Sequence, residues 1–222
     1  MIIAIDGPSG SGKSTLGRML ARQLNLLYID TGSMYRAVAL AVIEAGVEPT
    51  DTEAVTELAG KIDIDLKGDP DSLSVLLNGG DITEQIRSES VTAMSSIVSS
   101  IPGVRRAMVA RQRAIGERGA VLNGRDIGTV VFPDADIKFF LTAVPAERAE
   151  RRYKEDQITS SSSATLAETF ADMIERDRRD STRADSPLKV ADDAVVIDST
   201  GKTIQQVFEE MIERVADVHR NN

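Results

Sequence analysis

The chain has 222 residues, with 26 lysines and arginines against 35 aspartates and glutamates, which gives a net charge of −9. This acidic balance argues against a protein that coats DNA or an anionic membrane, because such binding calls for a basic surface. The absence of cysteine excludes disulfides, thiolate zinc sites and cysteine nucleophiles, and the single histidine, His219, stands too near the C-terminus to predict a triad or a metal cluster. Without a predicted signal peptide or membrane span, we expect a cytoplasmic protein.

Short apolar runs alternate with amphipathic helical patterns along most of the chain. This alternation predicts βαβ units and a mostly parallel sheet. Each run is followed by Asp, Asn or Thr, which is typical of buried strands whose carboxyl ends open onto polar loops. The predicted strands are residues 2–5, 26–29, 120–122, 137–141 and 194–197.

Helices are predicted where apolar residues recur with a period of 3.6. The clearest runs from Ile204 to Val215, and Thr203 with Gln206 has the spacing of a capping box at its start. Thr50 and Glu53 have the same spacing and predict the start of a shorter helix. Two more helices follow the first and second strands, with apolar faces at positions 16, 19, 20 and 24 and at positions 34, 37, 38, 41 and 42.

Two segments interrupt this alternation. From Ile62 to Ile82 the apolar residues recur with a period of two, and Asn78-Gly79 is a tight-turn signal, so we expect a small antiparallel meander beside the main sheet. Residues 159–163 are one threonine and four serines between arginine-rich helices, a composition that predicts a mobile loop.

The most specific motif is a phosphate-binding loop at residues 7–14, which matches G-x-x-x-x-G-K-[ST] at every fixed position. Its glycines let successive N–H groups point inward, and the helix that follows adds the positive end of its dipole. Lys13 then supplies a charge for the β- and γ-phosphates of a nucleotide, and the Ser14 hydroxyl is a ligand for Mg²⁺. A chance glycine-rich turn is the alternative, but the flanking strand and helix favour a functional loop. The predicted ATP-binding residues are Gly7, Pro8, Ser9, Gly10, Ser11, Gly12, Lys13, Ser14 and Thr15.

Two further polar motifs follow the second and third predicted strands, at the edge where the phosphate-binding loop lies. In residues 30–36, Asp30 is placed to hold a Mg²⁺-bound water and Arg36 to reach an acceptor phosphate. In residues 124–129, Arg125 suits a phosphate and Asp126 suits a hydrogen-bond donor of the ligand. The alternatives are an ordinary helix N-cap, with Thr31 or Ser33 capping, for the first motif and a self-paired surface turn for the second.

Arginines gather on two helix faces near the C-terminus. One face carries Arg148, Arg151 and Arg152, and the other carries Arg176, Arg179, Asp180 and Arg183. Neighbouring carboxylates make a solvated, salt-bridged surface an equal alternative. Two such faces around a flexible loop nevertheless suggest a lid that brings cations over transferring phosphates.

Together these motifs resemble the bacterial cytidylate (CMP/dCMP) kinases, a family of P-loop nucleoside monophosphate kinases, from residue 1 to about residue 218. The segments that carry the resemblance are residues 7–15, 30–36, 124–129, 176–183 and 187–200. The resemblance implies a three-layer α/β/α fold with a mostly five-stranded parallel sheet, a small NMP-binding insertion of antiparallel strands and a short lid. It also implies a single domain, with a core of residues 1–60, 97–150 and 184–222, an insertion at about 61–96 and a lid at about 151–183.

The activity implied by the resemblance is phosphoryl transfer from ATP to CMP and dCMP, with Mg²⁺ as cofactor. A cytosine pocket of Ser96, Arg105, Asp126 and Arg183 is implied too, and its chemistry is sound because a carboxylate accepts from the N4 amino group of cytosine. The implied catalytic residues are Lys13, Arg36, Arg125 and Arg176, and the implied metal ligand is Ser14. The implied CMP-binding residues are Asp30, Thr31, Arg36, Ser96, Arg105, Arg125, Asp126, Arg176, Asp180 and Arg183.

Two other functions stay open at this point. One is a related small kinase that phosphorylates UMP, AMP or a metabolite alcohol, and the other is a nucleotide-binding switch without catalysis. The sequence has neither the Asn-Lys-x-Asp motif of GTPases nor the Leu-Ser-Gly-Gly-Gln signature of transporter ATPases, so both of those classes are disfavoured. No coiled coil or large apolar stripe indicates an obligate dimer, and we expect a monomer whose partners are its small-molecule substrates.

Overall fold

The computed structural model describes residues 1–159 and 164–221. The Ser-rich segment that the sequence predicts as a mobile loop lies outside the described residues, except for Thr159.

A five-stranded parallel sheet in the order β2-β6-β1-β7-β8 forms the centre of the molecule. All five predicted strands are confirmed to within one residue at either end. The parallel order brings every carboxyl end to one edge of the sheet, where it positions polar residues together. The strands are β1 (Ile2–Asp6), β2 (Leu27–Asp30), β6 (Ala120–Asn123), β7 (Ile137–Thr142) and β8 (Val195–Asp198).

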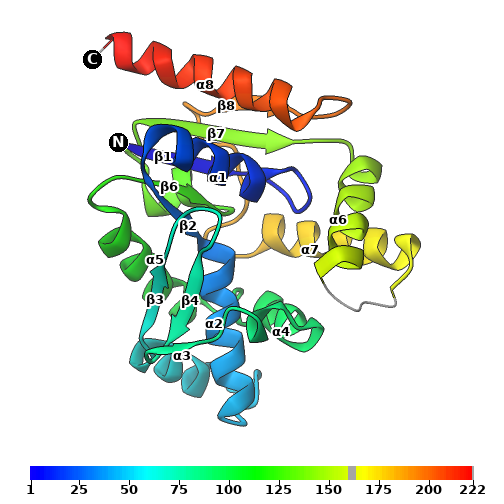
Figure 1. The fold of residues 1–222 in the computed structure, drawn as a ribbon. Coiled ribbons are helices and arrows are strands. Elements are labelled where there is room, and N and C mark those ends of the chain that lie inside the picture. Colours follow the sequence, from blue (N-terminus) through cyan, green and yellow to red (C-terminus); the bar gives the residue numbers. More distant parts are fainter. Residues whose placement is uncertain (160–163, 222) are drawn as a thin grey trace.

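Helices cover both faces of this sheet, which confirms the predicted three-layer arrangement (Figure 1). Successive strand side chains point to opposite faces, so Ile3 and Ile5 pack with α1 (Lys13–Leu24) and α8 (Ile204–Asn221). Ala4 between them faces the other layer, which includes α2 (Thr31–Glu44). Apolar side chains that recur with a period of two in the strands and of 3.6 in the helices are therefore buried between the sheet and the helices on both of its faces.

The predicted antiparallel meander is confirmed beside α2. It consists of β3 (Ile64–Lys67), β4 (Ser74–Leu77) and β5 (Gly80–Asp81), paired in that order. Asn78 and Gly79 both have positive φ, 50° and 84°, as a two-residue type I′ hairpin turn requires. The buried face of the meander joins the core cluster on the α2 side of the main sheet.

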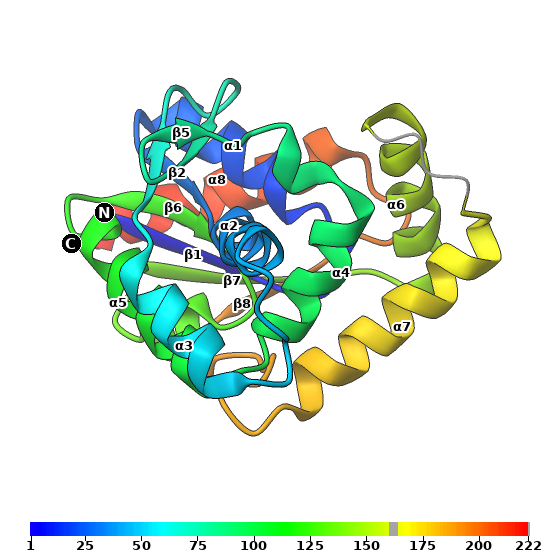
Figure 2. The same ribbon diagram turned by 90° about the horizontal axis from the view of Figure 1, so that it is seen from below.

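The remaining helices lie below the sheet or at its end (Figures 1 and 2), where α6 and α7 pack against each other. Within the described residues, no helix is both long enough and apolar enough to cross a membrane. These elements are α3 (Thr52–Lys61), the 3₁₀ turn η1 (Gln85–Arg87), α4 (Glu89–Val98), α5 (Pro102–Gly116), the π-helix η2 (Ile127–Val131), α6 (Pro145–Thr159) and α7 (Leu166–Thr182).

The two predicted capping boxes have different outcomes. Thr203 and Gln206 form the predicted box at the start of α8. The Thr203 amide donates to Gln206 Oε1 at 2.9 Å, and the Gln206 amide donates to Thr203 Oγ1 at 3.2 Å. The box of Thr50 and Glu53 is wrong, because α3 begins at Thr52 and its N-cap is Asp51, whose carboxylate accepts from the Ala54 amide at 3.0 Å. Aspartate caps at least as well as threonine, so the neighbouring residue takes the role.

We expect Asp51→Ala to lower the free energy of unfolding by about 1 kcal/mol, because it leaves the first amides of α3 without an acceptor. Thr50→Ala is the matched control and should leave stability unchanged. Urea unfolding of both variants measures the difference, and a larger loss for Thr50→Ala would restore the capping box predicted from the sequence.

Candidate active site

One large cavity opens over the carboxyl edge of the sheet. The ends of β1, β2 and β6 meet there, since Asn123 is in register with both Ile5 and Asp30. The cavity has a volume of about 940 Å³, enough for two nucleotides or one nucleotide and a second ligand. It extends from the phosphate-binding loop to α4 and α5 and is flanked by α6 and α7.

The phosphate-binding loop has the backbone that its glycines allow. Gly7 has a φ of +145°, and a Cβ at this position would collide with the carbonyl oxygen of Leu141. Gly10 has a φ of +71°, and a Cβ there would collide with the carbonyl oxygen of Arg148. The loop is therefore wound tightly against β7 and α6 by contacts that no other residue type permits.

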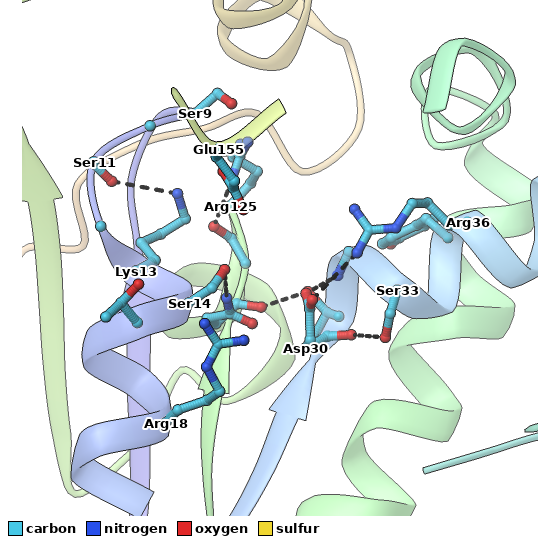
Figure 3. A pocket seen from close by; sticks show the side chains of 18 of the residues that line it. Ser9, Ser11, Lys13, Ser14, Arg18, Asp30, Ser33, Arg36, Arg125 and Glu155 are labelled. Carbon is cyan, nitrogen blue, oxygen red and sulfur yellow. Dashed lines mark hydrogen bonds and ion pairs between the residues drawn. The ribbon is translucent and has the colours of Figure 1, made fainter. Parts of the chain in front are cut away.

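Lys13 lies at the first position of α1 and is only 6% exposed. Its Nζ donates to the carbonyl oxygen of Pro8 at 2.6 Å and lies 3.4 Å from the Ser11 hydroxyl (Figure 3). Burial holds its pKa well below the usual range, and the positive charges of Arg125 and Arg176 lower it further. A polyphosphate in the loop would supply the negative charge that this ammonium group lacks.

Ser14 follows Lys13, and its hydroxyl accepts a hydrogen bond from Asn123 Nδ2 at 2.9 Å. The Oδ1 of Asn123 is buried and has no hydrogen-bond partner among the described residues. No cluster of three or more carboxylates or histidines that could hold a metal occurs in the described part of the chain. This donor set fits Mg²⁺ carried by a nucleotide, since such an ion keeps several waters and takes few protein ligands.

Asp30 and Arg36 lie at the start of α2 (Figure 3). Asp30 is the N-cap, since its Oδ1 accepts from the Gly32 amide at 3.0 Å, and its Oδ2 lies 3.3 Å from Arg36 Nη2. The alternative of an N-cap through Thr31 or Ser33 is wrong, because both hydroxyls donate to backbone carbonyls, at 2.8 and 2.6 Å. Asp30 thus caps the helix and also holds Arg36 over the cavity.

Asp126 and Arg105 form a buried ion pair at the far end of the cavity. Arg105 Nη2 lies 2.5 Å from Asp126 Oδ2, and the two side chains are only 2% and 6% exposed. Arg105 also donates to the Ser99 carbonyl oxygen at 3.0 Å, and its guanidinium lies 5.3 Å from the ring centre of Tyr35. Breaking such a pair is costly, so the fold holds both groups in fixed positions.

Two more arginines connect this pair to α7. Arg125 Nε donates to Asp180 Oδ2 at 2.9 Å, and Arg183 lies 3.5 Å from Asp180 and 3.7 Å from Asp126. Burial alone would raise the pKa of Asp180, but the neighbouring Arg125, Arg176 and Arg183 lower it, so its carboxylate is ionised. The alternative that residues 124–129 form a self-paired surface turn is wrong, because Arg125 and Asp126 each pair with a distant residue.

The arginines of α6 and α7 divide into two groups. Arg148, Arg151, Arg152, Arg178 and Arg179 are paired with nearby carboxylates, as the salt-bridged alternative predicts. The Arg148 guanidinium also donates to the carbonyl oxygen of Ser9 at 2.9 Å and so supports the phosphate-binding loop from behind.

Arg176 is different because it faces the cavity and makes no ion pair with any described residue. Burial lowers its pKa to about 10, and the positive charges of Arg125 and Arg36 lower it further, against the opposing effect of Asp180. It remains protonated at neutral pH. A cation repelled by neighbouring cations is relieved by a bound anion, which makes Arg176 a strong candidate for a phosphate ligand.

The cavity is locally basic although the chain is acidic. The described residues that line it include eleven lysines and arginines but only six aspartates and glutamates. This excess concentrates positive potential where the glycine-rich loop offers its amides, so the expected ligands are phosphorylated. The net charge of −9 is therefore compatible with a polyanionic substrate.

Most predicted site residues line this cavity, but three do not. Gly7 and Pro8, the first two residues of the loop, do not line the cavity, and Ser96 lies on a different face of α4 from it. Ser95 and Ser99 line the cavity in its place. The predicted residues that the structure brings together are Ser9, Gly10, Ser11, Gly12, Lys13, Ser14, Thr15, Asp30, Thr31, Arg36, Arg105, Arg125, Asp126, Arg176, Asp180 and Arg183.

Sequence reasoning missed several residues at or beside the site. Asp6 and Asn123 each end a buried strand, and that position at the carboxyl edge was the signal for both. Tyr35 adjoins Arg36 in the motif of residues 30–36, but nothing in the sequence shows that the Arg105 guanidinium lies over the Tyr35 ring. Burial raises the pKa of Tyr35 to about 12, so its hydroxyl stays protonated and is a donor.

Comparison with known proteins places the chain among relatives of similar length. It is 49% identical over 212 residues to a cytidylate kinase of Geobacter sp. (strain M21), an alignment that covers 95% of this chain and 91% of the relative. It is 50% identical over 217 residues to a cytidylate kinase of Solibacter usitatus, covering 97% and 92%. Among solved structures, an uncharacterized protein from Eubacterium ventriosum has a TM-score of 0.56 at 11% identity, with 98% of each chain covered, which shows a shared fold only.

A family model described as cytidylate kinase matches residues 3–217, which include the phosphate-binding loop, the buried pair of Arg105 and Asp126 and both arginine-bearing helices. Because this match spans nearly the whole chain and agrees with both relatives, the protein belongs to the cytidylate kinase family.

Proposed function

We propose that the protein transfers the γ-phosphoryl group of ATP to CMP and dCMP, giving ADP with CDP or dCDP. The observation that carries this proposal is the buried Asp126 carboxylate, fixed 2.5 Å from Arg105 in the same cavity as the phosphate-binding loop. Family membership supports the same reaction, since the relatives that the chain matches over most of its length are named cytidylate kinase.

The acceptor base is selected, in this proposal, by charge and hydrogen-bond pattern. Cytosine offers an N4 amino donor to the Asp126 carboxylate, whereas uracil would place a carbonyl oxygen there. Arg105 and Arg183 supply donors for the acceptors N3 and O2 of cytosine. Thr92 and Ser95 of α4, and Ser99 just after it, line the cavity with hydroxyl-bearing side chains, whereas Ser96 does not line it.

The transfer step needs cations and alignment rather than a side-chain base. The nucleophile is an oxygen of the acceptor phosphate, which is largely ionised near pH 7 because its second pKa is about 6. Arg36 and Arg125 hold this phosphate, while Lys13 and Arg176 neutralise the charge that develops around the transferred group. The γ-phosphoryl bond to the β-phosphate oxygen breaks as the new bond forms, and ADP leaves with that oxygen.

Mg²⁺ bound with ATP would supply charge neutralisation between the β- and γ-phosphates. The Ser14 hydroxyl would be its direct protein ligand, and Asp30 would hold a water of the ion. Asn123 orients the Ser14 hydroxyl through its 2.9 Å hydrogen bond and is therefore expected to support the same ligand.

An acceptor screen tests the proposal directly. Coupled ADP release is measured with CMP, dCMP, UMP, AMP and dTMP in turn, at fixed ATP and Mg²⁺. We expect rapid release with CMP and dCMP and much slower release with the others. Preference for UMP or AMP would replace the acceptor assignment, and ATP binding without acceptor-dependent release would indicate a nucleotide switch.

Arg176 and Arg178 provide a matched pair of variants on α7. Arg176→Met should lower kcat with CMP by about 10²-fold, since it removes a cation with no carboxylate partner from the phosphate end of the cavity. Arg178→Met should leave kcat within about twofold, because Arg178 is exposed and paired with Glu175 at 2.8 Å. Equal kinetics for the two variants would contradict the proposed role of Arg176.

We also infer that the enzyme acts as a monomer, since one chain supplies every residue assigned above. A cytoplasmic location is part of the same proposal, and the absence of cysteine from the sequence is compatible with it. The division into a core, an NMP-binding insertion at about 61–96 and a lid at about 151–183 is part of this proposal. It is supported by residues of the meander and of α6 and α7 that line the same cavity as the phosphate-binding loop.

A further inference from the structure

Asp6 is a buried carboxylate that the proposed reaction does not use. It is the last residue of β1, immediately before Gly7 of the phosphate-binding loop, and it is 4% exposed. Its Oδ1 accepts from the Ile127 amide at 2.8 Å, and its Oδ2 accepts from the Gly128 amide at 2.7 Å. Both oxygens are thus bound to backbone more than 120 positions away along the chain.

These two amides begin the π-helix η2, Ile127–Val131. The residue that would ordinarily cap this helix is Asp126, which immediately precedes it, but Asp126 makes no side-chain cap hydrogen bond. Its carboxylate is held instead by Arg105 at 2.5 Å, with Arg183 at 3.7 Å. Because an aspartate that caps its own helix turns back on the backbone, Asp126 can face the acceptor only if another residue takes the cap.

We propose that Asp6 is a positioning residue for acceptor selection, because it caps η2 from β1 and so leaves the Asp126 carboxylate to recognise the acceptor base. The inference rests on the proposed function. It also explains how one strand end serves both substrates, since Asp6 adjoins the loop that binds the donor and fixes the segment that recognises the acceptor.

The electrostatic environment of Asp6 does not favour its ionised form, so stability of the folded protein alone does not explain a carboxylate at this position. Burial raises its pKa to about 6, with a further rise from Asp126, against the lowering effect of the two amides and of Lys13. Lys138, on the neighbouring β7, is paired with Asp193 at 2.8 Å. The folded protein therefore retains a proton on Asp6 that the unfolded chain has already released, so the stability from this group is lost as the pH rises through 6. A buried carboxylate whose ionisation lowers the stability of the folded protein is typical of a functional position.

Asp6→Asn tests the inference, with Asp136→Asn as the control. Asp136 accepts from the Ile2 amide at 2.6 Å at the opposite end of β1, so it is a carboxylate–backbone contact remote from the cavity. For Asp6→Asn we expect the KM for CMP to rise about tenfold and the CMP-to-UMP ratio of kcat/KM to fall by a similar factor. The KM for ATP should stay within about twofold, and the midpoint of thermal unfolding at pH 7 should not fall.

The opposite pattern overturns the inference. Equal rises in both KM values with an unchanged CMP-to-UMP ratio, or a lowered unfolding midpoint that accounts for the loss, would assign Asp6 a merely structural role. The same result for Asp136→Asn as for Asp6→Asn would do so too. If the wild-type enzyme itself fails to phosphorylate CMP, the proposed function fails instead, so the two failures are distinguished.

A measurement on the wild-type protein does not depend on how the variant folds. The amide resonances of Ile127 and Gly128 are followed by NMR as a function of pH, and they should titrate together near pH 6. In this proposal CMP binds best when the ionised Asp6 carboxylate holds both amides. By linkage, adding CMP should therefore favour the ionised form and lower the midpoint. An anionic ligand that acts by charge alone would raise the midpoint. An unchanged or raised midpoint would therefore overturn the inference.

Discussion

Replacing Lys13 by alanine is expected to lower kcat for phosphoryl transfer to CMP by at least two orders of magnitude. Loss of one preorganised group that stabilises transition-state charge costs on the order of 10²–10³ in kcat. Lys13 is 6% exposed, and its ammonium group is held within the loop by Pro8 at 2.6 Å, so no solvent cation can replace it at the same position. Coupled ADP release with saturating CMP and ATP measures the effect.

The control is Lys61→Met, which removes an exposed lysine paired with Glu57 at 2.5 Å, far from the cavity. This variant should keep wild-type kinetics. Lys13→Arg should not rescue activity, because a planar guanidinium cannot replace a compact ammonium group in a buried loop. Turnover of Lys13→Ala within tenfold of wild type would show that the loop does not act on the transferred phosphates.

The sheet and the phosphate-binding loop were predictable from sequence because each is encoded locally. Five short apolar runs, each followed by a polar residue, permit little except buried parallel strands between amphipathic helices. The loop needs glycines at positions such as Gly7 and Gly10, where the backbone approaches β7 and α6 too closely for a Cβ. In both cases the signal lies within a short stretch of sequence, although the contacts that require Gly7 and Gly10 are made with distant residues.

The choice between adjacent residues could not be predicted in the same way. Near the end of α4, serines stand at 95 and 96 within the helix and at 99 and 100 just after it, so the pattern does not fix which of them turns to the cavity. A shift of one residue rotates a side chain by about 100°, and tertiary packing of Val91 and Val98 selects Ser95 and Ser99. Thr50 and Asp51 present the same difficulty, since both are good N-caps and only the position of α3 decides between them.

Contacts between distant residues were the least predictable part of the site. Asp6 caps η2 from the end of β1, and no local pattern in residues 124–131 shows that the cap comes from another strand. The arginines of α6 and α7 were ambiguous for a related reason. Arg178 has Glu175 three residues away and pairs with it, whereas Arg176 is directed to the cavity by the packing of α7 against α6.

The Arg105–Asp126 pair should show the second large effect, on both stability and acceptor use. Asp126→Ala leaves the Arg105 guanidinium, 2% exposed, without its counterion. We expect the free energy of unfolding to fall by about 3–5 kcal/mol, as is usual when one partner of a buried ion pair is removed. Use of CMP should be impaired far more than ATP binding, and Arg105→Ala should behave alike. Urea unfolding and separate KM values for CMP and ATP measure these effects.

A double variant separates the two consequences. Arg105→Met with Asp126→Leu replaces the pair by apolar side chains of similar size, and such replacements are often neutral for stability. Arg183 keeps a partner in Asp180 at 3.5 Å, so no further charge is stranded. The double variant should therefore unfold near the wild-type urea concentration and bind ATP normally, yet fail to discriminate CMP from UMP. If it regains wild-type kinetics with CMP, the pair serves only to hold α5 against the start of η2, and the cytosine must be recognised elsewhere in the cavity.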